Sequence, residues 1–191
     1  VLASNIEEYE RLNRMAENLM FLARAEHGQR PLHLHPVNLQ DVGQELCDCF
    51  DALAEDRQLR LDNQLHGTLT ADLHLLQRAL SNLLANAVRH AEPGSTVRLL
   101  RRDESGYCWI GVHNTGPTID PQHLNKLFDR FYRIDPSRAE PGDSGGLGLA
   151  IVRSIMHLHD GQVRVSSDDS GTLFYFFFSS RRRHTRWTGD W

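Results

Sequence analysis

Hydrophobic positions near the start of the chain recur every three or four residues. Between residues 6 and 26 they fall at Ile6, Tyr9, Leu12, Met15, Leu19 and Leu22. Charged and amide side chains occupy the positions between them, so this spacing predicts an amphipathic helix that ends at Gly28. Nothing else in residues 1–40 could bury the apolar stripe. We therefore expect its partner helix to be missing from the sequence or supplied by another chain.

The rest of the chain alternates between helical and strand-like patterns. A polar linker with two prolines is predicted over residues 31–38, and Asp72 is placed to cap a helix. Helices are predicted over residues 39–56, 72–91, 121–127 and 147–159. Strands are predicted over 59–63 and 68–71, around a turn at Gly67, and over 96–102, 107–113, 162–166 and 172–178. Mixed helices and mostly antiparallel strands predict an α+β fold, a two-layer α/β sandwich, in preference to a doubly wound parallel sheet.

Composition is that of a soluble globular protein. Of 191 residues, 40% are hydrophobic and 24% are charged, and the net charge of -4 argues against a general nucleic-acid binder. Three cysteines without paired spacing suit a reducing compartment. No apolar run approaches the roughly 18 residues that cross a bilayer, and no secretory signal opens the chain.

Both ends of the chain have unusual sequences. The first residue is Val1, within a helical pattern, so we interpret the N-terminus as a cut. Residues 179–191 combine a basic cluster with two tryptophans and show no apolar period. We expect this segment to be either a solvated basic tail or non-native sequence, and we leave it out of the fold prediction.

One face of the helix predicted over residues 72–91 carries Asn82, Asn86, Arg89 and His90. Amide oxygens can bind a metal ion such as Mg²⁺, and an arginine can contact a phosphate. A simply solvated helix face would explain the same residues.

A second group follows the strand predicted over residues 107–113. It contains Asn114, Gly116, Thr118 and Ile119. The Asn114 amide could contact a purine edge, and Gly116 would let the backbone approach a flat ligand. An ordinary turn is the alternative.

Two further groups complete the set. Residues 127–133 form a dense aromatic and basic block with Phe128, Phe131 and Arg133, for which we expect a buried anchoring role. A glycine-rich stretch then opens the last helix, where backbone N–H groups suit phosphate oxygens. Its residues are Gly142, Gly145, Gly146, Leu147, Gly148 and Leu149.

In order and spacing, the four groups resemble the nucleotide-binding boxes of sensor histidine kinases. These kinases share the GHKL ATPase fold with DNA gyrase, the Hsp90 chaperone and MutL, and the resemblance covers roughly residues 6–172. It implies ATP and Mg²⁺ as cofactors, with Asn86 as the Mg²⁺ ligand and Asn82 in support. Arg89 would contact phosphate, and His90 would lie near the nucleotide.

The remaining matches place the base and the phosphates. The resemblance implies that Asn114 meets the adenine amino group, where the family usually has aspartate, and that Gly116, Thr118 and Ile119 line the pocket. It matches Phe128, Phe131 and Arg133 to the box that anchors the ATP lid. It matches the second glycine box, against the phosphates, to Gly142, Gly145, Gly146, Leu147, Gly148 and Leu149.

Three positions depart from the family pattern. Asn114 replaces an aspartate, and Thr118 and Ser144 occupy frequent glycine positions. The first two departures, with residues 128–138 and 54–57, resemble the copper- and silver-responsive branch of these kinases.

The resemblance also implies a domain organisation. Residues 1–30 would be the second helix of a dimerisation hairpin, 31–38 a linker and 39–178 the ATP-binding catalytic domain. The acceptor histidine of the family is not recognisable among the eleven histidines, so we predict nucleotide binding without self-phosphorylation. The intact protein would form a homodimer and pass phosphate to the receiver domain of a response regulator. It would be anchored in the inner membrane by segments outside this sequence, with this part in the cytoplasm.

Three alternatives remain. Cys47 and Cys49, like the pairs His33/His35 and His157/His159, suggest metal sensing, but cysteines two apart lie about 200° apart on a helix. An ATP-binding relative that phosphorylates serine, of the anti-sigma type, is disfavoured by the first helix. A non-catalytic interaction module with a decayed pocket would explain Asn114 and Thr118.

Overall fold

The main sheet has five strands in the order β2-β4-β5-β7-β6. The computed structural model describes residues 2–28, 31–135 and 145–179. The β2–β4 pair is parallel, and the other three pairs are antiparallel. The strands are β2 (Arg60–Gln64), β4 (Thr96–Glu104), β5 (Tyr107–Asn114), β6 (Gln162–Asp168) and β7 (Gly171–Ser179).

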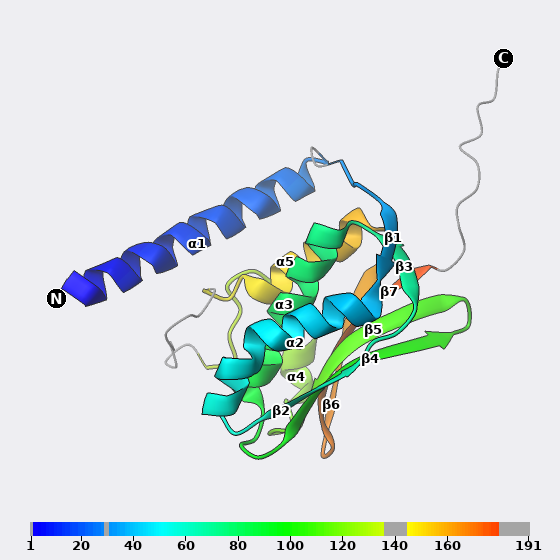
Figure 1. Cartoon of the computed structure of the whole chain (residues 1–191). Helices are drawn as coiled ribbons and strands as arrows, with labels where there is room; N and C mark the ends of the chain where they lie inside the picture. The colour runs from blue at the N-terminus through cyan, green and yellow to red at the C-terminus, as the bar shows by residue number, and fades with distance from the viewer. Residues whose placement is uncertain (1, 29–30, 136–144, 180–191) are drawn as a thin grey trace.

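Three helices cover one face of this sheet: α2 (Leu39–Asp56), α3 (Leu73–His90) and α5 (Gly148–Leu158) (Figure 1). The core lies between the two layers. Leu76, Leu80 and Leu84 of α3 are fully buried, as are Ile110 and Phe176 of the strands. The predicted α+β sandwich of two layers is confirmed.

Side-chain caps fix where most of the helices begin. The Asn38 side chain accepts from the backbone of α2 at 3.0 Å, and the Asp72 carboxylate accepts from Leu75 at 3.2 Å at the start of α3. Asp120 does the same for the short α4 (Pro121–Leu124). The cap predicted at Asp72 is therefore confirmed, and α5 differs because its N-cap residue, Leu147, makes no side-chain cap hydrogen bond.

The predicted linker over residues 31–38 contains a strand that the sequence analysis missed. β1 (His35–Asn38) pairs antiparallel with β3 (Thr68–Ala71) in a separate two-stranded sheet. Only Val37 of β1 is buried, so the segment shows no alternation of apolar and polar residues. The strands on either side of Gly67 therefore belong to different sheets.

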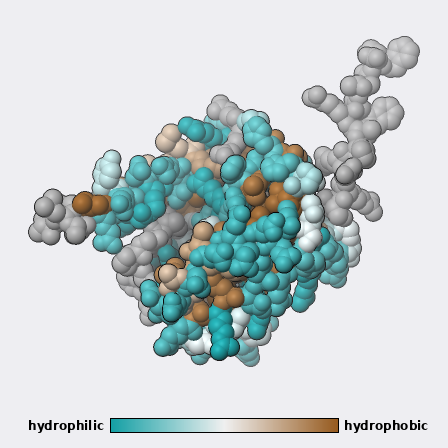
Figure 2. All heavy atoms as spheres, in the orientation of Figure 1, coloured by the Kyte–Doolittle hydropathy of each residue, from teal (hydrophilic) through white to brown (hydrophobic). Residues whose placement is uncertain are grey.

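Helix α1 (Leu2–Glu26) lies along the outside of the helical layer, and its first half extends beyond the body of the domain (Figure 1). Its last turns pack on α5, where Phe21, Leu22 and Ala25 are buried. The expectation that the chain itself cannot bury the stripe is therefore wrong at this end. Ile6 and Leu12 remain more than half exposed, and Figure 2 shows hydrophobic surface near the outer end of α1. Among the described residues, no helix combines the length and apolarity needed to cross a membrane.

Candidate functional site

The α3 face predicted to meet a ligand contains a buried amide without a partner. Asn82 and Asn86 lie one turn apart and are both half-buried. The Nδ2 atom of Asn82 is buried and has no hydrogen-bond partner among the described residues. A buried donor left unsatisfied costs about 1–3 kcal/mol. A ligand that accepts a hydrogen bond from this N–H group would remove the cost.

The end of α3 is held in place by the residue that follows α2. Arg89 is half-buried and His90 is exposed, both in the last turn of α3. The Arg57 guanidinium donates to the Arg89 carbonyl oxygen at 2.8 Å. This contact positions the backbone from which both side chains extend.

Asn114 ends β5 in a buried polar cluster. Its side chain is 3% exposed, and its Nδ2 atom donates to the Thr115 carbonyl oxygen at 3.3 Å. Thr172 of β7 lies directly opposite in the strand register and is 4% exposed. Asp72, Asn114 and Thr172 are the buried polar or charged residues of the described part of the chain. Two of these three, Asn114 and Thr172, therefore lie side by side at the end of β5.

Hydrogen bonds connect this cluster to Ile119, one of the residues predicted from the sequence. The Thr172 and Ser167 hydroxyl oxygens lie 2.8 Å apart, and Ser167 accepts from the Ile119 backbone N–H at 2.9 Å. Thr172 and Ser167 were missed by the sequence analysis. The sequence signal that could have pointed to them is the glycine beside Thr172. Gly171 has a φ of 127° and lies so close to the Asn114 carbonyl oxygen that no side chain fits.

Gly116 joins this cluster to the end of α3. A Cβ atom at Gly116 would lie 2.6 Å from the His90 carbonyl oxygen and 3.3 Å from Asn114 Nδ2. We expected Gly116 to let a flat ligand approach the backbone, but the group that it approaches is the α3 backbone at His90. Thr118 is exposed and Ile119 half-buried further along the loop. The first two predicted groups are thus brought together.

The aromatic block and the glycine stretch also meet. Phe128 is buried edge-to-face against Phe174, at 6.0 Å between ring centroids, so its predicted burial is confirmed. Phe131 differs, because it is 54% exposed and has a φ of 61°. Its N–H donates to the Gly146 carbonyl oxygen at 2.9 Å, and a Cβ at Gly146 would lie 2.9 Å from Phe131 Cα. Arg133 is half-buried nearby in sequence.

The start of α5 is the segment that the sequence predicts to bind phosphate. Leu147 is buried immediately before the helix, and Gly148 and Leu149 in its first turn are half-buried. The N-cap residue Leu147 makes no side-chain cap hydrogen bond, and backbone N–H groups at a helix start are suited to bind an anion. Gly145 approaches the Met15 side chain of α1 closely. Gly142 and Ser144 lie outside the described residues.

The histidine closest in context to a phosphoacceptor, His159, has a structural role. Its Nδ1 donates to the Ile155 carbonyl oxygen at 2.8 Å, and its Nε2 accepts from the Asp72 N–H at 3.1 Å. Burial lowers the pKa of this imidazole below its usual 6.5. The neutral ring therefore ties α5 to the start of α3, and both of its nitrogen atoms are engaged.

The suggested metal ligands do not converge. Cys47 is buried and Cys49 is exposed, which confirms that the two thiols face different sides of α2. The described part of the chain holds no group of three or more His, Cys, Asp or Glu side chains that could bind a metal ion.

Comparison with known proteins identifies the fold family. Residues 71–182 match the family of histidine kinase-, DNA gyrase B-, and HSP90-like ATPases. The chain belongs to this family. The matched segment includes all four groups of this ATPase domain, from α3 to the start of α5.

The curated relatives of this ATPase domain are sensor proteins. The chain is 43% identical to sensor histidine kinase CusS of Escherichia coli (strain K12) over 177 residues, which cover 91% of this chain and 36% of that protein. It is 42% identical to sensor protein CzcS of Cupriavidus metallidurans over 175 residues, covering 91% and 37%. The chain thus spans little more than a third of the length of these relatives.

Solved structures share the fold. The histidine kinase AdeS of Acinetobacter baumannii superposes with a TM-score of 0.79 at 22% identity, covering 95% of this chain and 84% of that chain. Full-length ShkA in complex with AMPPNP gives 0.77 at 24% identity, covering 90% and 36%. These likenesses confirm the fold predicted from the sequence.

Proposed function

We propose that this chain is the ATP-binding catalytic part of a sensor histidine kinase. It would donate the γ-phosphate of ATP to a histidine, from which an aspartate of a response regulator receives it. The observation that carries the proposal is the unsatisfied amide of Asn82, on the α3 face of a domain that belongs to an ATPase family.

The residues present fit Mg²⁺ and ATP. Asn86 would bind Mg²⁺ through its amide oxygen, and Asn82 would donate to a phosphate or to water on the ion. Arg89 and the backbone at the start of α5 would hold phosphate oxygens. The buried Asn114 would meet the adenine, positioned by Thr172. Bound Mg-ATP would supply the phosphoryl group, and the chain would bind and orient it.

The acceptor and the partners belong to the whole protein. We infer that the acceptor is none of the eleven histidines here, because none has the expected sequence context and both ring nitrogens of His159 are engaged. The exposed stripe of Ile6, Tyr9 and Leu12 supports pairing of α1 in a dimerisation hairpin. Similarity to CusS and CzcS supports the copper- and silver-responsive (heavy-metal) branch, with this part on the cytoplasmic side of the membrane.

Binding of a fluorescent ATP analogue, with and without Mg²⁺, tests the proposal. We expect Mg²⁺-dependent binding that Asn86→Ala weakens at least tenfold, as loss of a metal ligand should. Asn13→Ala, at an exposed position of α1, is the matched control and should bind normally. Unchanged binding by Asn86→Ala would refute the site, and no binding at all would favour the interaction-module alternative. Radiolabelled ATP should leave no acid-labile label on the chain.

A further inference from the structure

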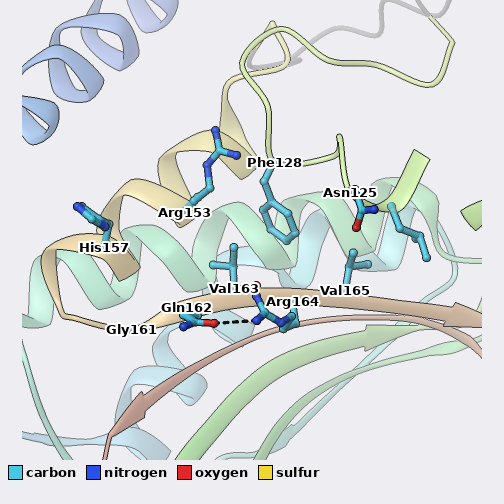
Figure 3. A pocket seen from close by; sticks show the side chains of 10 residues that line it. Asn125, Phe128, Arg153, His157, Gly161, Gln162, Val163, Arg164 and Val165 are labelled. Atoms are coloured by element: carbon cyan, nitrogen blue, oxygen red, sulfur yellow. Dashed lines mark hydrogen bonds between the residues drawn. The ribbon is translucent and has the colours of Figure 1, made fainter. Parts of the chain in front are cut away.

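A groove of about 450 Å³ lies on the far side of α5 from α1, along strand β6 (Figure 3). Side chains of a strand alternate between its two faces. Because consecutive residues 161–165 all line the groove, it must follow the edge of β6. The opposite wall contains Arg153 and His157, which lie one turn apart on α5. Of the residues predicted for the nucleotide site, the groove includes only Phe128.

The groove has an apolar floor and a basic rim. Val163, Val165 and the buried Phe128 form the floor. Arg153, His157 and Arg164 stand at the rim, and none of the residues lining the groove carries a carboxylate. Such a surface complements a ligand with both apolar and anionic groups.

The two arginines differ in how far they are neutralised. Arg153 donates to an Asp129 carboxylate oxygen at 3.1 Å. Arg164 donates to neutral oxygens, the Gln162 side chain at 2.8 Å (dashed in Figure 3) and the Val163 carbonyl at 3.0 Å. Arg164 is therefore the stronger attraction for an added carboxylate.

β6 is also the last strand of its sheet. Backbone groups on the outer edge of such a strand can pair with an extended peptide. The Arg164 guanidinium covers the Val163 carbonyl oxygen, which protects the edge and places a positive charge on it. An incoming strand would have to engage this guanidinium, so an acidic segment is favoured over a neutral one.

We propose that the β6–α5 groove binds an extended, acidic segment of a partner protein. Apolar side chains of the segment would lie on Phe128, Val163 and Val165, and its carboxylates would contact Arg164 on one wall and Arg153 and His157 on the other. This docking site shares only Phe128 with the residues predicted for the nucleotide site, and it does not depend on the function proposed above.

A fluorescein-labelled octapeptide of alternating glutamate and valine, ended by proline to limit self-association, is a direct probe. Fluorescence anisotropy should show saturable binding to the chain. Arg164→Glu should weaken it about tenfold, as charge reversal at a contact does. Arg60→Glu is the matched control, because Arg60 is an exposed residue of β2 at the opposite edge of the sheet. The Arg60→Glu variant should bind the peptide as tightly as wild type. Replacing the peptide glutamates by glutamine should also weaken binding about tenfold.

Several results would overturn the proposal. They are a lack of saturable binding, an equal loss in the two variants, or equal binding of the glutamine peptide. Competition by a saturating ATP analogue would place the peptide in the nucleotide site instead. Sedimentation should find the same mass for wild type and Arg164→Glu, since a shift in mass would assign the groove to a second copy of the chain. Unfolding midpoints of the variants verify that each is folded.

Discussion

The unsatisfied amide of Asn82 leads to a prediction in which stability and binding change in opposite directions. Asn82→Leu keeps the size of the side chain and removes the buried donor that has no partner in the described chain. Its removal should therefore stabilise the nucleotide-free domain, whereas the same change should impair nucleotide binding.

The two magnitudes follow from the cost and strength of hydrogen bonds. An unsatisfied buried donor costs about 1–3 kcal/mol. Because Asn82 is only half-buried, we expect the lower end, a gain of about 1 kcal/mol in the free energy of unfolding. A hydrogen bond to a charged group contributes about 1.5–3 kcal/mol. Its loss should weaken binding of Mg-ATP about 10- to 100-fold.

Urea unfolding without nucleotide measures the first effect, and titration with a fluorescent ATP analogue in Mg²⁺ measures the second. Asn63→Leu is the matched control. Both polar atoms of the Asn63 amide are hydrogen-bonded, since Nδ2 donates to the Gln40 carbonyl oxygen at 3.0 Å and Oδ1 accepts from the Leu65 N–H at 3.1 Å. Asn63→Leu should cost about 1–3 kcal/mol of unfolding free energy and leave nucleotide affinity unchanged. If Asn82→Leu destabilised the domain as Asn63→Leu does, or bound nucleotide normally, the reasoning would be refuted.

Three further outcomes are expected. Gly116→Ala should cost about 1–3 kcal/mol of unfolding free energy and weaken nucleotide binding, because its Cβ would lie 2.6 Å from an α3 carbonyl oxygen. Gly94 has a φ of 83° and open space around it, so Gly94→Ala should cost about 1–2 kcal/mol and leave nucleotide binding unchanged. Because the pKa of His159 is lower in the folded state than in the unfolded chain, acid favours the unfolded chain, and the free energy of unfolding should fall as pH drops below about 6.5. Urea unfolding between pH 8 and 5 should show a steeper loss in wild type than in His159→Gln. Leu22→Ala, at a buried α1 position, should lower the unfolding free energy by about 2–4 kcal/mol, whereas exposed Leu12→Ala should have little effect in the same urea titration.

Local sequence signals account for the parts of the fold that were predicted well. The predicted span of residues 39–56 coincides with α2, and Asp72 caps α3 as expected. Both helices have strongly amphipathic sequences and polar capping residues, so their limits are encoded locally. Strand β1 has one buried residue, Val37, and its place depends on pairing with β3, about thirty residues away. A signal of that kind is not local, and the segment was interpreted as a linker.

The candidate site shows the same limit. Asn114 could be singled out because it follows an apolar strand, but its environment depends on strand register. Thr172 lies opposite Asn114 only because β7 pairs with β5, and Ser167 joins them only because β6 pairs with β7. Motif spacing therefore identified groups on single elements. The supporting residues come from neighbouring strands and required the structure.

Helix α1 also has a closer relation to the site than the sequence suggested. The carboxylate of Glu26 accepts from Arg130, which lowers the pKa of Glu26, and Met15 contacts Gly145. Arg130 belongs to the aromatic block and Gly145 to the glycine stretch, so α1 contacts the chain on both sides of residues 136–144. Phe131 and Gly146 are in turn joined backbone to backbone between those contacts. A movement of α1 against α5 would therefore change the positions of the residues that lead into the predicted phosphate site.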